Sequence, residues 1–395
     1  ECDLIQSFLF YNDITQMSRL HRSASRQMSR PAVTLRNSGS WTFGSPSVLM
    51  MYYRAPGELG KELAEMYECM PHYYKITNGH GRGAELLMDA EAAYLQGAWE
   101  KAAVLLERAR ADAAGQENMT LCCDFLALRL ALCGKGKEEY DFAAKRAALL
   151  QKHDGVQVHL LESIAAYFYA LQGRPEQAPE LFREHKLAEV SFFGPCRPMM
   201  SLIEQQVWLA QGEYVKVIAH SEGLLRRCEA MHYGLVGLQA RIQLAAAQLR
   251  FGQRAEARAA LAAALLDAVQ DDFWVLFVEQ YPALAPLLEG EDWAACAPCL
   301  GPFVARILPA GRAFAARLGL PIPAPELPLT DRDRELARLV AGRCTNKEIA
   351  AALYLSEGTV KQYINQLYAK LDMGGDPRTR RARLAEWYQK NAPRN

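Results

Sequence analysis

The 395-residue sequence lacks the features that mark membrane and secreted proteins. No apolar run approaches the roughly 18 residues that span a bilayer, so we expect no transmembrane helix and no membrane partner. The N-terminus, ECDLIQSFLFYND, has no basic region before its apolar residues, which a secretory signal requires. The ten cysteines are scattered along the chain, a pattern typical of reduced proteins rather than disulfide scaffolds. The sequence therefore predicts a cytoplasmic protein.

Groups of residues that carry catalysis or hold metals are also missing. The eight His do not cluster, and no nucleophile–base–orienter set or pair of carboxylates in a recognisable loop is present. Cys296 and Cys299 have redox spacing, but no strand–helix–strand pattern surrounds them and no second pair completes a zinc site. We therefore expect no enzymatic activity, no catalytic residue, no metal and no cofactor.

Net charge is zero, but the charges are unevenly placed. The chain has 45 Lys and Arg against 45 Asp and Glu. From Leu329 onward there are 13 basic and 8 acidic residues, which leaves 32 against 37 for the rest. A basic module attached to a slightly acidic body is typical of a nucleic-acid-binding domain joined to a domain with another role.

A phrase that recurs in the body predicts helical repeats. It reads LQGAWEKA from Leu95, LQGRPEQA from Leu171 and AQGEYVKV from Ala210. Glycines at 97, 134, 173, 212 and 252 are separated by 37, 39, 39 and 40 residues. A period near 40 is typical of helical hairpins of the tetratricopeptide class, in which stacked pairs cover faces that one pair cannot cover alone. We expect Gly97, Gly173 and Gly212 in the turns, and Ala102 and Ala178 where the helices cross closely.

The sequence divides into four expected parts of an all-α chain. Residues 1–56 are expected to be an irregular segment, the remnant of a preceding domain, because the chain begins with Glu rather than Met. Residues 57–318 are the tetratricopeptide-like solenoid. GLPIPAPELP, residues 319–328, predicts a Pro-rich linker. Residues 329–395 are a four-helix module built around a helix-turn-helix.

Capping residues define the helices of this last module. Thr345 followed by Glu348 is a capping box, and Ser356 is a second N-cap that opens a helix to Leu371. Gly374 and Gly375 end that helix, because Gly enters the left-handed region without strain. Residues 378–388 then predict a basic fourth helix.

The second of these capped helices has two different faces. Val360, Ile364, Leu367 and Leu371 form one apolar stripe at helical spacing. Gln362 and Asn365 lie away from the stripe and Lys361 lies on its flank. We expect these three side chains to read base edges in a major groove. Asn and Gln pair with adenine through two hydrogen bonds, and Lys reaches guanine O6 and N7.

At these residues the chain resembles the LuxR/FixJ family of bacterial helix-turn-helix regulators. The matching positions are Leu329-Thr330, Arg332, Glu335, Ala341, Asn346-Lys347-Glu348-Ile349-Ala350, Leu353, Ser356, Thr359-Val360-Lys361 and Lys370-Leu371. Arg343 for a usual Gly, Tyr363 for a usual His and Asp372 for a usual Gly depart from the pattern. The departures are expected to affect local turns and the target sequence rather than the fold.

Five further side chains of the module are expected to contact phosphates. They are polar groups at helix N-termini or on the flanks of the helices, where they position a duplex without reading its sequence: Thr345, Asn346, Thr359, Tyr363 and Lys370.

The body resembles the tetratricopeptide-like region of large MalT-type LuxR regulators. The stretches that carry this resemblance are TFGSPSVLMMYYRAPGEL from Thr42 and MPHYYKITNGHGRGAELLMDAEAAYLQG from Met70. In such proteins a nucleotide-binding switch domain precedes the repeats. No G-x-x-x-x-G-K-[ST] occurs in this sequence, so the resemblance implies that the ATPase part is missing from this chain and that ATP is not its cofactor.

Together these observations predict a sequence-specific transcriptional regulator, an activator by family resemblance. Its expected partners are double-stranded DNA, RNA polymerase and a small-molecule or protein effector on the repeats, with a dimer or higher oligomer on DNA. Two other interpretations remain open. One is a helical-repeat protein-binding scaffold with a weak or vestigial helix-turn-helix, and the other is the C-terminal part of an ATP-switched regulator of the STAND type.

Overall fold

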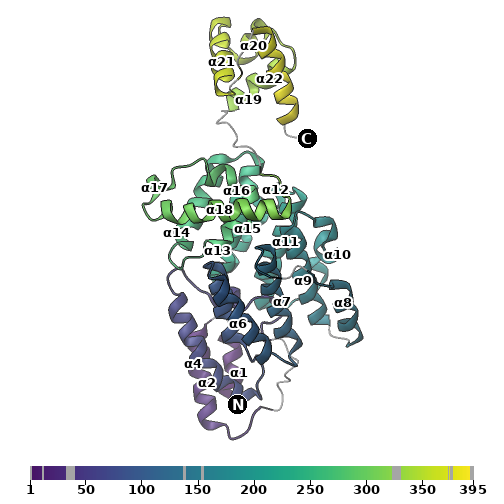
Figure 1. The fold of residues 1–395 in the computed structure, drawn as a ribbon, viewed down its shortest axis with the longest axis vertical. Helices are drawn as coiled ribbons and strands as arrows, with labels where there is room; N and C mark the ends of the chain where they lie inside the picture. Colours follow the sequence, from purple (N-terminus) through teal and green to yellow (C-terminus); the bar gives the residue numbers. More distant parts are fainter. Residues whose placement is uncertain are drawn as a thin grey trace. The chain divides into compact units, whose positions relative to one another are not determined.

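The structure is a computed structural model that describes residues 2–10, 13–32, 41–136, 139–152, 155–322, 331–371, 373 and 377–391. Over these ranges the secondary structure is helical, without any strand, which confirms the all-α class (Figure 1). None of the helices in these ranges has the length and apolar character needed to span a bilayer. The chain forms two compact units, Glu1–Ile322 and Pro323–Asn395, called here the N-terminal and C-terminal units.

The helices of the N-terminal unit follow one another with short connections. The first group is α1 (Cys2–Ser7), α2 (Ile14–Gln27), α3 (Leu49–Tyr52), α4 (Leu59–Thr77), α5 (Ala84–Leu95), α6 (Trp99–Asp112), α7 (Glu117–Leu132), α8 (Phe142–Gln151) and α9 (Gly155–Leu171). The second group is α10 (Glu180–Arg183), α11 (Arg197–Gln211), α12 (Tyr214–Ala230), α13 (Gly234–Phe251), α14 (Arg254–Ala268), α15 (Val275–Glu279), α16 (Tyr281–Leu288), α17 (Trp293–Cys296) and α18 (Leu300–Leu318). Short 3-10 helices lie at Phe8–Phe10, Pro175–Gln177, Leu187–Glu189 and Gly194–Cys196.

The predicted turn glycines lie where the sequence places them. Gly97 connects α5 to α6, Gly212 connects α11 to α12, and Gly252 connects α13 to α14, with φ of 73°, 81° and 93°. Positive φ is accessible to Gly without a steric cost, and this explains why the recurring phrase contains Gly. The two helices on either side of each turn pack against each other. Ala102 is buried on the inner side of α6, as the close crossing of α5 and α6 requires.

One repeat departs from the prediction. Gly173 is in a turn with φ of 67°, but no long helix follows it. A 3-10 helix and the four-residue α10 replace that helix, because Pro175 and Pro179 lack the backbone N–H that a helix interior needs. Ala178 is therefore buried beyond the end of the 3-10 helix rather than in a helix crossing.

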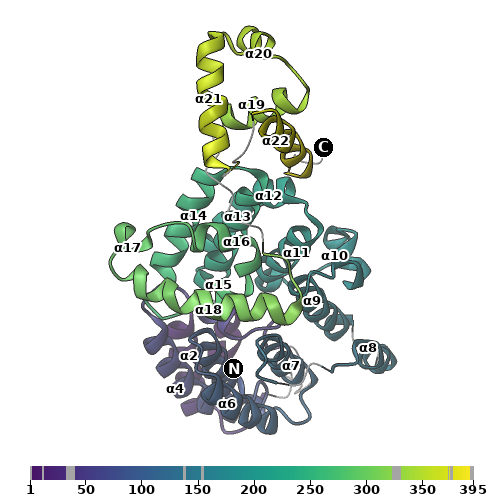
Figure 2. The same cartoon turned by 45° about the horizontal axis from the view of Figure 1, so that its top comes forward.

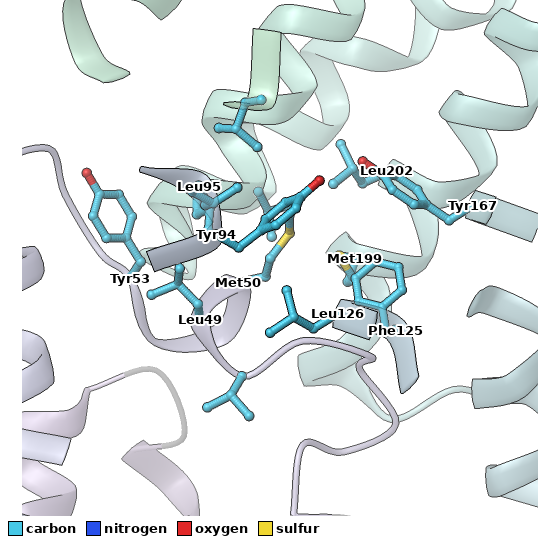
Figure 3. Close-up of a cluster of buried hydrophobic side chains, with 14 of the residues drawn as sticks. Leu49, Met50, Tyr53, Tyr94, Leu95, Phe125, Leu126, Tyr167, Met199 and Leu202 are labelled. Carbon is cyan, nitrogen blue, oxygen red and sulfur yellow. The ribbon is translucent and has the colours of Figure 1, made fainter. Parts of the chain in front are cut away.

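The core of the N-terminal unit lies between the first helices of successive hairpins. Helices α7, α9 and α13 bury residues on nearly all their sides, which is expected for helices that are apolar all round. Helices α6, α12 and α14 bury one face only. The short helix α3 lies among the inner helices, and Figure 3 shows its Leu49 and Met50 beside buried side chains of α5, α7, α9 and α11.

The segment from Trp274, just before α15, to Leu320 folds back onto the turn glycines. A Cβ on Gly97 would lie 2.1 Å from Trp274 Cζ2, and one on Gly173 would lie 2.7 Å from Leu320 Cδ2. A Cβ on Gly134 would lie 2.1 Å from an Arg317 guanidinium nitrogen. Figure 2 shows the long helix α18 of this segment crossing in front of α15. The glycines therefore serve two purposes, since they allow the turn and also the close approach of this segment.

A buried ion pair joins this segment to the repeat helices. Arg129 of α7 donates to both carboxylate oxygens of Glu279 in α15, at 2.8 and 3.1 Å. The hydroxyls of Tyr94 and Tyr167 donate to the same carboxylate at 2.7 and 3.0 Å. The Arg129 and Glu279 side chains are only 3% and 1% exposed. Both charges are therefore paired and hydrogen-bonded, as buried charges must be.

The expectation of an irregular segment at residues 1–56 is wrong for much of its length. Helix α2 begins after an Asp13 cap and packs on α4, and α3 is fully buried. The buried face of α2 includes polar residues, of which His21 contacts Ser7 Oγ and Cys69 Sγ at 3.0 Å each. The helical periodicity of apolar residues, read from the sequence, does not reveal a buried face that includes polar side chains. Burial lowers the pKa of His21 to about 4, so this imidazole is neutral at pH 7.

The expected Pro-rich linker lies mostly outside the described residues. Its first residue, Gly319, ends α18 with φ of 64°. The remaining domain limits stay predictions.

Candidate nucleic-acid interface

The C-terminal unit contains the four helices that the sequence predicts. They are α19 (Asp331–Ala341), α20 (Asn346–Leu353), α21 (Glu357–Lys370) and α22 (Pro377–Asn391). Helix α19 packs on α21 and α22, and α20 packs on α21. Their shared core contains Leu336, Val340, Ile349, Val360, Ile364, Leu367, Tyr368, Leu371 and Leu384. The unit therefore has its own hydrophobic core.

The predicted capping box starts α20. Thr345 Oγ1 accepts a hydrogen bond from Glu348 N at 3.3 Å, and Glu348 Oε2 accepts one from Thr345 N at 2.6 Å. The N–H of Thr345 lowers the pKa of the Glu348 carboxyl, because this hydrogen bond favours its charged form. The helix ends at Tyr354, which has φ of 56° and is 96% exposed. These local interactions fix the turn that connects α20 to α21.

Helix α21 has the two faces that the spacing predicts. Its first turn is capped by Ser356, whose Oγ accepts a hydrogen bond from Thr359 N at 3.1 Å. The stripe of Val360, Ile364 and Leu367 is buried, as is Leu371 just beyond the helix. Tyr368 is also buried and widens the stripe.

The opposite face of α21 presents polar side chains to solvent. Lys361, Gln362 and Asn365 are exposed, and within the described part of the chain none of them has a hydrogen-bond or ion-pair partner. Lys361 and Asn365 are four residues apart and so lie on one side of the helix. Because these donor and acceptor groups have no partners among the described residues, they can contact base edges without first breaking interactions within the protein.

Three of the expected phosphate contacts already have internal partners. Thr345 is engaged in the capping box, and the Thr359 hydroxyl lies 2.7 Å from Ser356 Oγ. Asn346 Oδ1 accepts from Arg381 of α22 at 3.0 Å, which leaves its amide N–H₂ as a donor. Thr345 and Asn346 lie together at the start of α20, where backbone N–H groups favour an anion.

The other two expected phosphate contacts have different surroundings. Tyr363 is half-buried, and the guanidinium of Arg332 in α19 lies 4.9 Å from its ring centroid. This cation–π contact orients the ring at the edge of α21. The side chain of Lys370 lies outside the described residues.

Sequence reasoning missed the role of Arg381. Its guanidinium donates to Asn346 Oδ1 and to the carbonyl oxygen of Cys344, so it joins α22 to the residues before α20. The sequence shows Arg381 only as one of several cations in a basic helix. A single sequence carries no signal for this contact, because it joins residues 35 positions apart.

Unpaired positive charge lies at the exposed parts of the helix-turn-helix. Arg343 before α20, Lys347 in its first turn and Lys361 in α21 are all exposed. In the ranges that the structure describes, no carboxylate lies within ion-pair distance of these three cations. Free cations on one small unit can neutralise phosphates and release the counterions condensed on a duplex.

Comparisons with known proteins agree with this geometry. Residues 327–379 match the model of the bacterial regulatory proteins, luxR family. The chain is 41% identical over 75 residues to the uncharacterized transcriptional regulatory protein YvfU of Bacillus subtilis, covering 19% of this chain and 36% of that protein. It is 42% identical over 65 residues to the DNA-binding transcriptional activator DevR/DosR of Mycobacterium tuberculosis, covering 16% and 29%. The matches cover about a third of these relatives, and no solved structure matches significantly. The chain thus carries a LuxR-family helix-turn-helix domain near its C-terminus.

Proposed function

We propose that this protein is a sequence-specific DNA-binding regulator of transcription. In this proposal α21 enters the major groove, and Lys361, Gln362 and Asn365 contact base edges. The observation that carries it is the exposed polar face of α21, which has no partner among the described residues, on a helix whose other face is buried. This helix lies within a domain that matches the LuxR family.

The flanking groups would hold the backbone of the duplex. Thr345, Asn346 and Thr359 would contact phosphates near the N-termini of α20 and α21, mainly through backbone N–H groups and the free amide of Asn346. Tyr363 and Lys370 would contact phosphates from the flank of α21. Arg381 would position Asn346 rather than contact DNA.

The N-terminal unit would sense the signal. We propose a tetratricopeptide-like solenoid, supported by the paired helices at Gly97, Gly212 and Gly252 and by the packing of α7, α9, α11 and α13 in succession. An effector would bind this unit and change how the C-terminal units assemble on DNA, as dimers or larger oligomers. The similarity to the DNA-binding transcriptional activator DevR/DosR supports activation, and RNA polymerase would be the partner.

Substitution of the exposed face of α21 tests the base contacts. Lys361→Ala and Asn365→Ala should each reduce the preference for the target over random DNA by about 1–3 kcal/mol. Binding titrations on both duplexes at one salt concentration measure this, with Lys61→Ala in α4 as the control for loss of one exposed cation. Equal losses on both duplexes would contradict base reading.

A further inference from the structure

A cavity of about 190 Å³ lies where α9, α11 and α16 meet the residues that follow α18. Its walls are apolar and polar in nearly equal parts, and Leu171, Leu209 and Leu320 are among the apolar lining side chains. An engineered cavity of about 150 Å³ holds a benzene molecule, so a volume of about 190 Å³ has room for about eight non-hydrogen atoms. All its lining residues belong to the N-terminal unit.

Two buried glutamines form the polar floor of the cavity. Gln206 and Gln280 are each only 4% exposed. Gln206 Oε1 accepts hydrogen bonds from Gln280 Nε2 at 2.5 Å and from Gln243 Nε2 at 3.0 Å. The Gln206 amide N–H₂ and the Gln280 amide oxygen have no partner among the described residues. The floor therefore offers an amide donor and an amide acceptor that a ligand can reach from the cavity.

The charge of Glu279, which also lines the cavity, is not available to a ligand. Its carboxylate already accepts hydrogen bonds from Arg129, Tyr94 and Tyr167. Among the residues that the structure describes, the only other charged side chain that lines the cavity is Arg250. Arg250 is exposed at the end of α13, and its Nε donates to the Tyr214 hydroxyl at 3.4 Å. Over the described residues no carboxylate pairs with it, so the rim offers a guanidinium for an anion.

We propose that this cavity binds a small carboxylate that also carries a primary amide, or an equivalent adjacent donor and acceptor. The carboxylate pairs with Arg250, and the amide group completes the hydrogen bonds of Gln206 and Gln280. This proposal deepens the sensing role proposed above and rests on it. It names the chemical class of the effector.

The position of the cavity connects an occupant to the segment before the C-terminal unit. Leu320 and Pro321 line the cavity, and Leu320 also lies against Gly173. Leu320 N donates to Ala315 O at 2.9 Å, at the end of α18. A bound ligand therefore contacts the last residues of the N-terminal unit and should slow hydrogen exchange at the amide of Leu320.

Titration of the whole chain with succinamate tests the proposal. Succinamate has one carboxylate and one primary amide, whereas butyramide lacks the carboxylate and succinate lacks the amide. Calorimetry or ligand-observed NMR should show saturable binding of succinamate, and binding of the other two compounds at least about tenfold weaker, the loss expected for a missing charge-assisted hydrogen bond. Equal binding of the three compounds, or no saturation by succinamate, would overturn the proposal.

Two variants assign any binding to this cavity. Arg250→Gln should weaken succinamate binding by about tenfold or more, while Arg227→Gln, at an exposed cation of α12 that does not line the cavity, should leave it unchanged. Both positions are on the surface, so both variants should fold. Equal affinities of the two variants would place the ligand elsewhere. Because no DNA is present, failure here is distinguishable from failure of the DNA-binding function.

Discussion

Glu91 shows at the scale of a single residue how the N-terminal unit places a carboxylate in its core. The side chain is in α5 and is 1% exposed. Its Oε2 accepts a hydrogen bond from Leu49 N at 2.7 Å, while its Oε1 has no hydrogen-bond partner in the described part of the chain. Burial raises the pKa of Glu91 to about 7, against the smaller lowering effect of that backbone N–H. Glu91 thus holds the start of α3, and burial favours its protonated form although the hydrogen bond from Leu49 N favours the charged form.

This raised pKa makes the stability of the N-terminal unit depend on pH. The folded chain keeps a proton on Glu91 that the unfolded chain releases between about pH 4.5 and 7, so stability falls as pH rises through this window, by ~3 kcal/mol. Glu91→Gln should remove that part of the pH dependence. Urea unfolding at pH 5 and pH 8 measures it, with Glu100→Gln on the exposed side of α6 as the control. An unchanged pH dependence in the Glu91 variant would contradict the assignment.

At the scale of elements, the turn glycines decide how closely the segment from Trp274 to Leu320 approaches the repeats. Gly97 and Gly252 both have positive φ. A Cβ at Gly97 meets the Trp274 ring, whereas a Cβ at Gly252 meets no atom within 4 Å. Gly252 therefore needs glycine only for its positive φ, whereas Gly97 needs it both for its positive φ and for the close packing of Trp274.

Alanine at these two positions should have different costs. Gly252→Ala adds only the strain of a left-handed conformation, about 1–2 kcal/mol. Gly97→Ala adds the same strain and also displaces Trp274. This overpacking should reduce the free energy of unfolding by a further ~1–3 kcal/mol. Urea unfolding followed by tryptophan fluorescence compares them, because five of the six Trp lie in the N-terminal unit. Equal losses of unfolding free energy in the two variants would show that Trp274 can move aside without destabilising the fold.

The elements that could be predicted from the sequence are those that depend on interactions between residues close together in the sequence. The capping box at Thr345, the cap at Ser356 and the stripe from Val360 depend on residues three or four positions apart, and all three are present. The turn at Gly97 was predictable for the same reason. Helix α2 was missed because its buried face includes Ser and His side chains that tertiary contacts satisfy.

The parts that could not be predicted join distant residues. The contact of Arg381 with Asn346 depends on how α22 lies against the helix-turn-helix, and no periodicity encodes it. Likewise, the cavity between Gln206, Gln280 and Leu320 is lined by residues of α9, α11 and α16 and by the residues after α18, which are far apart in the sequence. For the candidate site, the exposure of Lys361, Gln362 and Asn365 could be predicted, because it follows from the buried stripe. Their contacts with DNA stay a proposal.

At the scale of the whole molecule, the pair of Arg129 and Glu279 holds the fold-back segment to the repeats. Its partners come from α7 and α15, which are 150 positions apart in the sequence. The aromatic rings of Tyr94 and Phe125 lie within 4.7 and 5.5 Å of the Arg129 guanidinium carbon, so the charge is also in contact with aromatic faces.

Removal of one charge of this pair should destabilise the N-terminal unit severely. Arg129→Met leaves the Glu279 carboxylate buried without a counterion, at a cost of about 3–5 kcal/mol. The double variant Arg129→Met with Glu279→Gln keeps an acceptor for Tyr94 and Tyr167 and should lose less than the single variant. Urea unfolding measures both. If the double variant is less stable than Arg129→Met, the unpaired Glu279 carboxylate is not the cause of the destabilisation.

The central claim is that the exposed face of α21 selects a DNA sequence. The most direct measurement selects genomic fragments on the purified chain and then determines the affinity for the recovered site and for random duplex at one salt concentration. The account predicts a preference of about a thousandfold or more for the recovered site. It also predicts that Lys361→Ala or Asn365→Ala reduces that preference by about tenfold. Equal affinity for the recovered and random duplexes would contradict it.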